Sequence, residues 1–127
     1  PTRLSHFKSD YTLVVFGASW CPKCNTEINQ MAASYSNWKK NGVDVLFVSL
    51  DDDEAAFDQF TMAFPFVSIC DLKKWESPIA DDYYVSATPT MLLLDKNKKI
   101  LLRPISAKQV DAWVNWFLVE GNQIPNN

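Results

Sequence analysis

The chain contains few of the residues that build metal centres or disulfide scaffolds. Its 127 residues include three cysteines and one histidine, His6. Three cysteines are too few to staple a fold, and because the number is odd, at least one forms no disulfide within the chain. His6 is expected at the surface or in packing rather than in a metal site. Cysteine usage alone leaves the cellular compartment open.

Long apolar runs and a large charge excess are also lacking. No apolar run approaches the roughly 18 residues that suggest a membrane span. A net charge of −3 without a cluster of lysine and arginine argues against a nucleic-acid partner. A hydrophobic fraction of 47% with 21% charged residues is ordinary for a globular protein. We expect one domain over residues 1–127, with a lead-in segment at 1–10 and a mobile tail at 122–127.

Two of the cysteines lie between an expected strand and an expected helix. The run Tyr11–Phe16 predicts a buried strand that Gly17 closes, and a helical pattern begins at Pro22. This order places Cys21 at the amino end of the helix, where free N–H groups and the helix dipole stabilise a thiolate. Cys24 lies one turn further on, close enough to displace whatever Cys21 has captured. The spacing predicts a dithiol/disulfide redox centre with an accessible nucleophile, Cys21, and a deeper resolving thiol, Cys24.

A structural disulfide or a zinc site is the alternative for these two cysteines. Structural zinc needs four ligands, and beyond Cys21 and Cys24 the chain offers only Cys70 and His6, with no second closely spaced pair. No metal is therefore expected. Cys70 lies in a short apolar run, residues 66–71, and is expected to be a buried thiol outside the redox centre.

The remaining pattern predicts an α/β domain. Helices are expected where apolar residues recur every three or four positions: 22–41, the segment after 54 to near 65, 77–83, and a closing helix that ends near 121. Strands are expected at 11–16, 43–50, 90–94 and 99–102, the last two forming a hairpin. The acidic run 51–54 is interpreted as a helix cap, because it lacks the alternating ligands of a calcium loop. The order predicts a mixed sheet with helices on both faces and its first two strands parallel.

Two motifs resemble the thioredoxin superfamily. Trp20-Cys21-Pro22-Lys23-Cys24 after a Val/Phe-rich strand is similar to its active site, and Thr88-Pro89 before an apolar strand is similar to its Thr-Pro loop. Glu27 completes the Trp-Cys-x-x-Cys-x-x-Glu signature of the TlpA/ResA-like thiol–disulfide oxidoreductases. The resemblance extends over roughly residues 11–117. It implies a thioredoxin-like fold, and the long stretch between the second strand and Thr88-Pro89 resembles the insertion that this group carries there.

The resemblance also implies roles for individual residues. Glu27 would accept a proton during the reaction, because Val15 stands where thioredoxins carry a buried aspartate. The alternative for Glu27 is an acidic residue that is simply favoured near a helix start. The Thr88-Pro89 peptide would be cis and would bind an extended substrate segment.

Trp20 and Pro22 are expected beside Thr88 and Pro89 in the substrate groove. The family usually has a proline two residues after its glutamate, where this chain has Asn29. The first helix is therefore expected to lack the family's usual kink.

The function implied is thiol–disulfide exchange without a cofactor, in the direction of reducing protein disulfides. The expected partners are protein disulfide or dithiol substrates and an upstream electron donor, acting on a monomer in the periplasm or cell envelope. Because the sequence starts at Pro1, we expect a domain excised from a longer precursor with a membrane tether.

Two other classes stay open at this stage: a metal- or haem-handling carrier, and a redox-inert interaction module of the same fold. A peroxiredoxin is disfavoured, since Ala18 stands where that class needs Thr or Ser.

Overall fold

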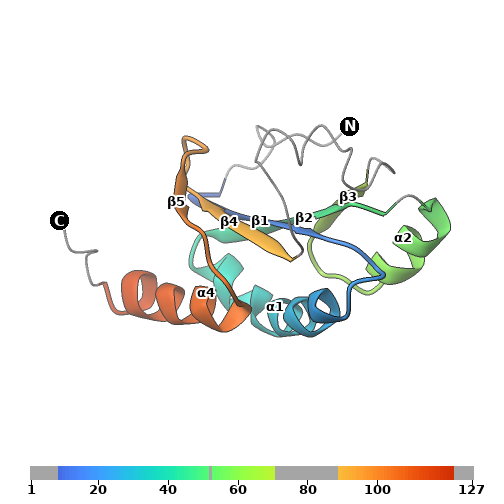
Figure 1. Ribbon diagram of the computed structural model, residues 1–127. Helices are drawn as coiled ribbons and strands as arrows, with labels where there is room; N and C mark the ends of the chain where they lie inside the picture. Colours follow the sequence, from blue (N-terminus) through green and yellow to red (C-terminus); the bar gives the residue numbers. More distant parts are fainter. Residues whose placement is uncertain (1–8, 52, 71–88, 122–127) are drawn as a thin grey trace.

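The computed structural model describes residues 9–51, 53–70 and 89–121. They form a five-stranded sheet in the order β3-β2-β1-β4-β5, with helices packed beneath it as drawn in Figure 1. The strands are β1 (Tyr11–Gly17), β2 (Val43–Ser49), β3 (Val67–Cys70), β4 (Thr90–Leu94) and β5 (Ile100–Leu102). The helices are α1 (Pro22–Lys40), α2 (Glu54–Thr61) and α4 (Ala107–Trp113), which continues as the π-helical segment η3 (Val114–Val119). The mixed sheet and the thioredoxin-like arrangement expected from the sequence are confirmed.

The strand pairing follows the prediction and adds one strand to it. β1 and β2 are parallel, β4 runs antiparallel to β1, and β4 and β5 form the expected hairpin. β3 lies in the short apolar run 66–71, for which no strand is predicted, and pairs in parallel with β2. It is a four-residue edge strand in which Val67 is exposed and the other residues are half-buried. Such a short edge element has too few residues to show a period of its own.

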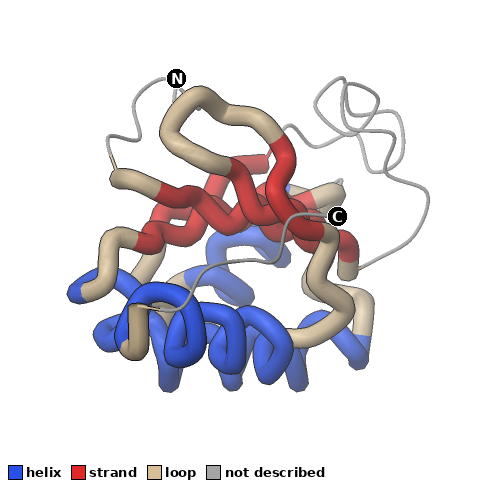
Figure 2. Tube along the Cα trace, turned by 90° about the vertical axis from the view of Figure 1, so that its left-hand side faces the viewer, coloured by secondary structure: helices blue, strands red, loops and turns tan. Residues whose placement is uncertain are grey.

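Side chains of alternate residues of the central strands enter two cores, one on each face of the sheet. Leu13 and Val15 of β1 point to the face that α1 and α4 cover, whereas Val14 and Phe16 point to the other. Figures 1 and 2 show the described helices on one side of the sheet. The helix predicted at 77–83 lies outside the described residues.

Helix α1 has the boundaries and the apolar stripe that its sequence predicts. Ile28, Met31 and Trp38 are fully buried against the sheet. The helix ends after Lys40, and Gly42 adopts the positive φ of 89° that turns the chain into β2. The stripe therefore fixes the helix on the sheet and, with it, the position of the two cysteines at its amino end.

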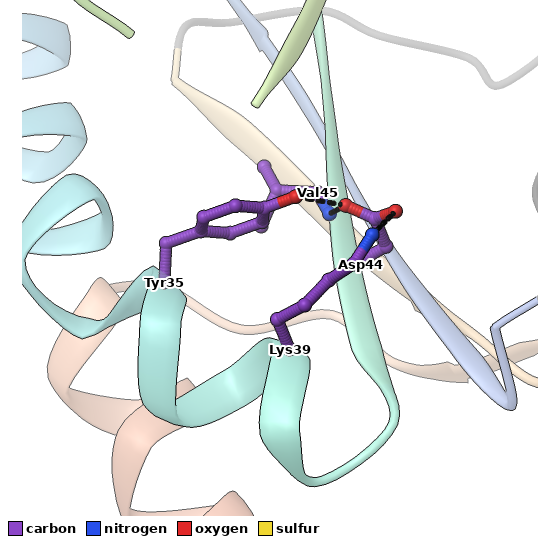
Figure 3. A network of polar contacts seen from close by, with 4 residues as sticks. All are labelled: Tyr35, Lys39, Asp44 and Val45. Atoms are coloured by element: carbon purple, nitrogen blue, oxygen red, sulfur yellow. Dashed lines mark hydrogen bonds and ion pairs between the residues drawn. The ribbon is translucent and has the colours of Figure 1, made fainter. Parts of the chain in front are cut away.

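The last turns of α1 are joined to the start of β2 by polar contacts that we call the Asp44 network (Figure 3). The carboxylate of Asp44 accepts hydrogen bonds from Tyr35 Oη (2.7 Å), Lys39 Nζ (2.7 Å) and Val45 N (2.8 Å). Burial alone would raise the pKa of Asp44, but these donors outweigh burial and the pKa is lowered.

The same contacts act on the partners of Asp44. The hydrogen bond to Asp44 raises the pKa of Lys39. Burial, followed by the contact with Asp44, raises the pKa of Tyr35. All three shifts favour the neutral tyrosine, the ammonium and the carboxylate, which is the state that the contacts require.

Helix α2 covers the edge of the sheet rather than its centre. Asp53 is its N-cap and accepts a hydrogen bond from Ala55 N at 3.0 Å, so part of the acidic run caps a helix as predicted. No residue of α2 is fully buried. Phe60 and Phe64 are half-buried and pack edge-on against Phe47, with ring centroids 5.9 and 5.7 Å away. The predicted apolar face of this helix packs against the sheet, but its side chains stay half exposed.

The closing helix begins at Ala107 and changes to π-helical winding after Trp113. Ser106 caps it by accepting a hydrogen bond from Gln109 N at 3.1 Å. Trp113 stacks on Phe117 at a centroid distance of 5.2 Å and so closes the core at this end. Within the described ranges, none of the helices combines the length and the apolarity needed to cross a membrane.

Candidate active site

Cys21 is the N-cap residue of α1, the position that the sequence predicts. Its backbone is extended, with φ −102° and ψ 109°. Its Sγ accepts a hydrogen bond from Cys24 N at 3.3 Å, so the sulfur lies against the first turn of the helix. Neighbouring N–H groups and the positive end of the helix dipole both favour a negative charge on that sulfur. This is an environment that suits a nucleophilic thiolate.

Burial distinguishes the two cysteines in the order that the sequence predicts. Cys24 is fully enclosed, whereas Cys21 keeps 6% of its surface exposed. Cys21 is less open than an accessible nucleophile suggests, because its sulfur turns back toward Cys24 N and packs in the core cluster on the helix side of the sheet.

Gly17, the last residue of β1, makes room for Cys24. A Cβ at this position would meet Cys24 Sγ and the Phe47 ring, both at 3.0 Å. Any side chain here would force the sulfur or the ring to move. The break that ends the strand is thus also what allows Cys24 to pack directly under the backbone.

The sheet register brings several loops to one edge. β1 and β2 are parallel with Gly17 opposite Ser49, so their carboxyl ends lie side by side. β4 runs the other way with Thr90 opposite Phe16, so the start of β4 lies at the same edge. Pro89, directly before Thr90, is therefore brought to the edge at which Cys21 follows β1.

The predicted substrate-groove residues are placed unequally. Trp20 is 46% exposed and Pro22 is exposed, on either side of the buried Cys21 in the sequence. Pro89 is half-buried. Thr88, and with it the Thr88-Pro89 peptide predicted to be cis, lies outside the described residues. Trp20, Pro22 and Pro89 are thus the three predicted groove residues that the structure positions.

Glu27 lies one turn after Cys24 on α1 and is 7% exposed. Its Oε1 accepts a hydrogen bond from Ala107 N at 3.2 Å, across 80 positions of sequence. Ala107 is the first residue of α4, so the carboxylate satisfies a free N–H at the start of that helix. Neither alternative from the sequence named this contact: Glu27 caps a helix, but not its own.

Asp51 is the residue that the sequence analysis missed. It follows β2 and is only 2% exposed, so it is not part of the solvent-facing cap made by Asp53. Its carboxylate accepts hydrogen bonds from Ser19 N (3.1 Å), Ser19 Oγ (2.6 Å) and Ser49 Oγ (2.5 Å). We call these contacts the Asp51 network. A signal was available: an aspartate directly after a buried strand reaches the edge where the cysteine loop lies.

Cys70 ends β3, opposite Ser49 in the register, and is half-buried rather than buried as predicted. Its Sγ donates to Asp51 O at 3.4 Å. The third cysteine therefore touches the residue that holds the loop before Cys21. Across the part of the chain that the structure describes, three or more cysteine, histidine, aspartate or glutamate side chains nowhere gather as metal ligands.

Residues 9–100 match the family model described as thioredoxin-like. The chain belongs to the thioredoxin-like family. The match contains both the cysteine pair at the start of α1 and the strand that follows Pro89. The resemblance to the TlpA/ResA-like group that the sequence motifs indicated is confirmed as well.

Curated relatives of this family member carry thiol–disulfide oxidoreductase names. The ResA thiol-disulfide oxidoreductase of Geobacillus kaustophilus is 26% identical over 98 residues, which cover 77% of this chain and 56% of the relative. ResA of Oceanobacillus iheyensis is 29% identical over 98 residues, covering 77% of this chain and 50% of the relative. The chain thus spans about half the length of these relatives.

Solved structures share the fold. A solution structure of a thiol:disulfide interchange protein from a Bacteroides species superposes with a TM-score of 0.83 at 21% identity, covering 94% of this chain and 80% of that one. A thiol-disulfide oxidoreductase from Bacteroides fragilis gives a TM-score of 0.76 at 28% identity, covering 88% and 84%. The first establishes the architecture alone, and the second joins that architecture to a sequence likeness.

Proposed function

We propose that this domain exchanges disulfides with protein substrates through Cys21 and Cys24. The observation that carries the proposal is the position of Cys21 Sγ at the helix start, 3.3 Å from Cys24 N. Two cysteines one helical turn apart, one slightly exposed and one enclosed, have the order that two-step exchange requires. The oxidoreductase names of the relatives support the same reaction class.

The reaction balances as a two-electron transfer. The Cys21 thiolate attacks one sulfur of a substrate disulfide, forms a mixed disulfide and releases the other substrate sulfur as a thiolate. Cys24 then loses its proton and attacks Cys21 Sγ, which frees the second substrate thiol and leaves a Cys21–Cys24 disulfide. An upstream dithiol returns the pair to the reduced state by the same two steps in reverse. We propose the reducing direction for the domain, with a protein dithiol as donor.

Substrate binding is proposed for the edge where Trp20, Pro22 and Pro89 lie. The small exposed area of Cys21 suits a thin, extended segment rather than a bulky surface. The chain beside Pro89 would pair with that segment as an added strand does. Thr88 is proposed for the same groove on the family resemblance, together with the cis peptide.

Glu27 is proposed as the proton acceptor for Cys24. It is buried and lies one turn from Cys24 on the same helix, and no other described acidic residue of α1 competes for the role. The contact with Ala107 N occupies one carboxylate oxygen, Oε1. Capping of α4 and proton transfer are therefore compatible on one side chain.

The wider setting is proposed from the family alone. We propose that the domain acts as a monomer in the periplasm or cell envelope, held there by a membrane tether outside residues 1–127. Fractionation of cells that express the complete protein checks this, and recovery of the protein with intact cytoplasm contradicts it.

A trapping experiment tests the reaction. The Cys24→Ser variant should accumulate a mixed disulfide with a protein substrate, because the resolving thiol is gone, whereas Cys21→Ser should accumulate none. Cys70→Ser is the matched control, since it removes the third thiol and leaves the pair intact. Non-reducing gels and mass spectrometry identify the trapped partner.

Equal trapping by the Cys21→Ser and Cys24→Ser variants contradicts the assigned roles. A redox titration with glutathione supplies a second measurement on the unmodified chain. If Cys21 and Cys24 stay in one state across the range of biological potentials, about −270 to −120 mV, the exchange reaction is ruled out.

A further inference from the structure

The Asp51 carboxylate is buried at the edge of the sheet where the cysteine loop begins, and both of its oxygens accept hydrogen bonds. It takes three close hydrogen bonds, from Ser19 N, Ser19 Oγ and Ser49 Oγ, with a longer approach of Ser19 N to Oδ1 at 3.3 Å. All of these donors are neutral, and among the described residues no ion pair reaches Asp51. Burying a carboxylate that has only neutral donors costs desolvation free energy. The place where the fold accepts that cost is therefore a candidate for a functional role.

The loop between β1 and α1 is fixed at three points. Leu50 N donates to Gly17 O at 2.8 Å, and Cys21 N donates to Ala18 O at 3.2 Å. The carboxylate of Asp51 holds Ser19 by both its N–H and its hydroxyl. Two of these three attachments come from the residues directly after β2, so that segment determines the path of the backbone into Cys21.

The group affected by losing the contact between Asp51 and Ser19 is Cys21. Ser19 lies two residues before Cys21, and the intervening Trp20 is 46% exposed. Loss of the attachment at Ser19 removes the side-chain tie between this loop and the segment after β2, two residues before Cys21. The Cys21 sulfur would then lose its constant place at 3.3 Å from Cys24 N.

We infer that Asp51 is the positioning residue of Cys21: through Ser19 it holds the sulfur at the helix start in the geometry for attack. The inference rests on the proposed exchange reaction at Cys21 and adds a residue that acts on it without touching substrate. Hydrogen bonds carry the effect, so an amide at position 51, which retains one acceptor oxygen, should replace most of it.

The test isolates one thiol. Because the chain has three cysteines, Cys24→Ser with Cys70→Ser leaves Cys21 as the sole thiol. In this background, the rate of Cys21 alkylation by iodoacetamide is measured across pH for Asp51→Ala, Asp51→Asn and Ser19→Ala. Asp44→Ala is the matched control: it removes a carboxylate of similar burial, 8% against 2% exposed, from the other end of the same strand.

The expected result separates position from stability. Asp51→Ala should raise the pH midpoint of alkylation by about one unit and so slow the reaction about tenfold below that midpoint, because a sulfur displaced from the helix start loses the N–H groups and the dipole that favour its thiolate. Ser19→Ala should have the same direction and a smaller size, and Asp51→Asn should recover most of the rate. Asp44→Ala should lower the urea midpoint of unfolding and leave Cys21 alkylation unchanged.

Two results overturn the inference. The first is an alkylation rate, measured below the pH midpoint, within about twofold of the background in both Ser19→Ala and Asp51→Ala, since loss of the helix-start position predicts about tenfold for Asp51→Ala. The second is an equal loss in Asp51→Asn and Asp51→Ala, which would show that the hydrogen bonds to an acceptor oxygen at position 51 do not carry the effect. Failure of the proposed function is a separate outcome: the unmodified three-cysteine chain would then reduce no protein disulfide, whatever position 51 does to Cys21.

Discussion

Strand β2 carries a buried aspartate network at each end, and the two are built differently. The Asp44 network includes a cation, Lys39, whose side chain is 54% exposed. It joins residues five and nine positions apart, the last turns of α1 and the start of β2. The Asp51 network has only neutral donors and joins residues 32 positions apart. One network connects neighbouring elements, and the other connects two strand ends at the cysteine loop.

This difference indicates that Asp44 stabilises the packing of α1 on β2, whereas Asp51 positions the loop at the candidate active site. A pair such as Asp44 and Lys39 keeps its charge solvated on one side, so it stabilises modestly and needs no special setting. Asp51 is nearly fully enclosed, and the groups that donate hydrogen bonds to its carboxylate are all neutral. Such an arrangement is retained for specificity of position in some proteins, and here the position that it fixes is that of Ser19.

The largest expected effect is on stability, and it compares the two aspartates directly. Asp51→Ala leaves a buried serine hydroxyl and a loop N–H without their acceptor, and should lower the free energy of unfolding by about 3 kcal/mol. Asp44→Ala should cost about 1–2 kcal/mol, since Lys39 can return to solvent. Urea denaturation of both variants at one pH measures the ratio. A larger loss for Asp44→Ala would reverse the comparison.

Two glycines extend the comparison between the two ends of β2: Gly17 pairs with the last residue of β2, and Gly42 directly precedes its first residue. Gly17→Ala introduces a Cβ 3.0 Å from Cys24 Sγ and the Phe47 ring, and should cost about 1–3 kcal/mol through overpacking. Gly42→Ala should cost about 1–2 kcal/mol because its φ is 89°. Only the first should alter the reactivity of the cysteines.

Thermal unfolding and the exchange rate with a glutathione disulfide give the two readouts for the glycine variants. Unchanged exchange in a folded Gly17→Ala variant would show that Cys24 tolerates displacement. Altered exchange in Gly42→Ala would show that the amino end of β2 communicates with the site.

The sequence predicted the elements that have a regular spacing of apolar residues or a glycine or proline at their boundary. Gly17, Pro22 and Gly42 mark the ends of β1, α1 and the turn into β2, and the structure has these elements within a residue or two of their predicted bounds. The position of Cys21 at a helix start follows from the same markers. The order of strands and helices then determines which strands are parallel.

The contacts that complete the site depend on pairings far apart in sequence. Asp51 stands in an acidic run that reads locally as a helix cap, and only the register of Gly17 with Ser49 brings it to Ser19. The bond from Ala107 N to Glu27 crosses 80 positions and depends on how α4 docks. No short window of sequence contains both partners of either contact, so the partners could not be predicted; for Asp51, only its place directly after a buried strand indicated the edge that it reaches.

Glu27 gives a smaller effect that distinguishes its two roles. Glu27→Ala should lose about 1 kcal/mol of stability, since Ala107 N loses its acceptor. Glu27→Gln retains an acceptor oxygen and should keep that stability, yet it has no proton to exchange. We expect its rate of disulfide exchange to lose the pH dependence that the carboxylate supplies. Stopped-flow rates across pH check this, and an unaltered profile in Glu27→Gln would leave Glu27 as a helix cap only.

The smallest effect is expected in acid, at the Asp44 network. The pKa of Asp44 is lowered from 3.8 by its donors, so its contribution to stability is complete above 3.8 and is lost as pH falls through the lower value of the folded state. The difference in free energy of unfolding between the parent chain and Asp44→Asn should therefore shrink as pH falls below 3.8, and should be constant from there to neutral pH. Urea denaturation at a series of pH values measures it. The effect is small because Lys39 is half exposed and its attraction is screened. A difference that grows in acid would mean that the Asp44 carboxylate is protonated in the folded chain. The Asp44 network would then contain no ion pair, and it would not differ from the Asp51 network in charge.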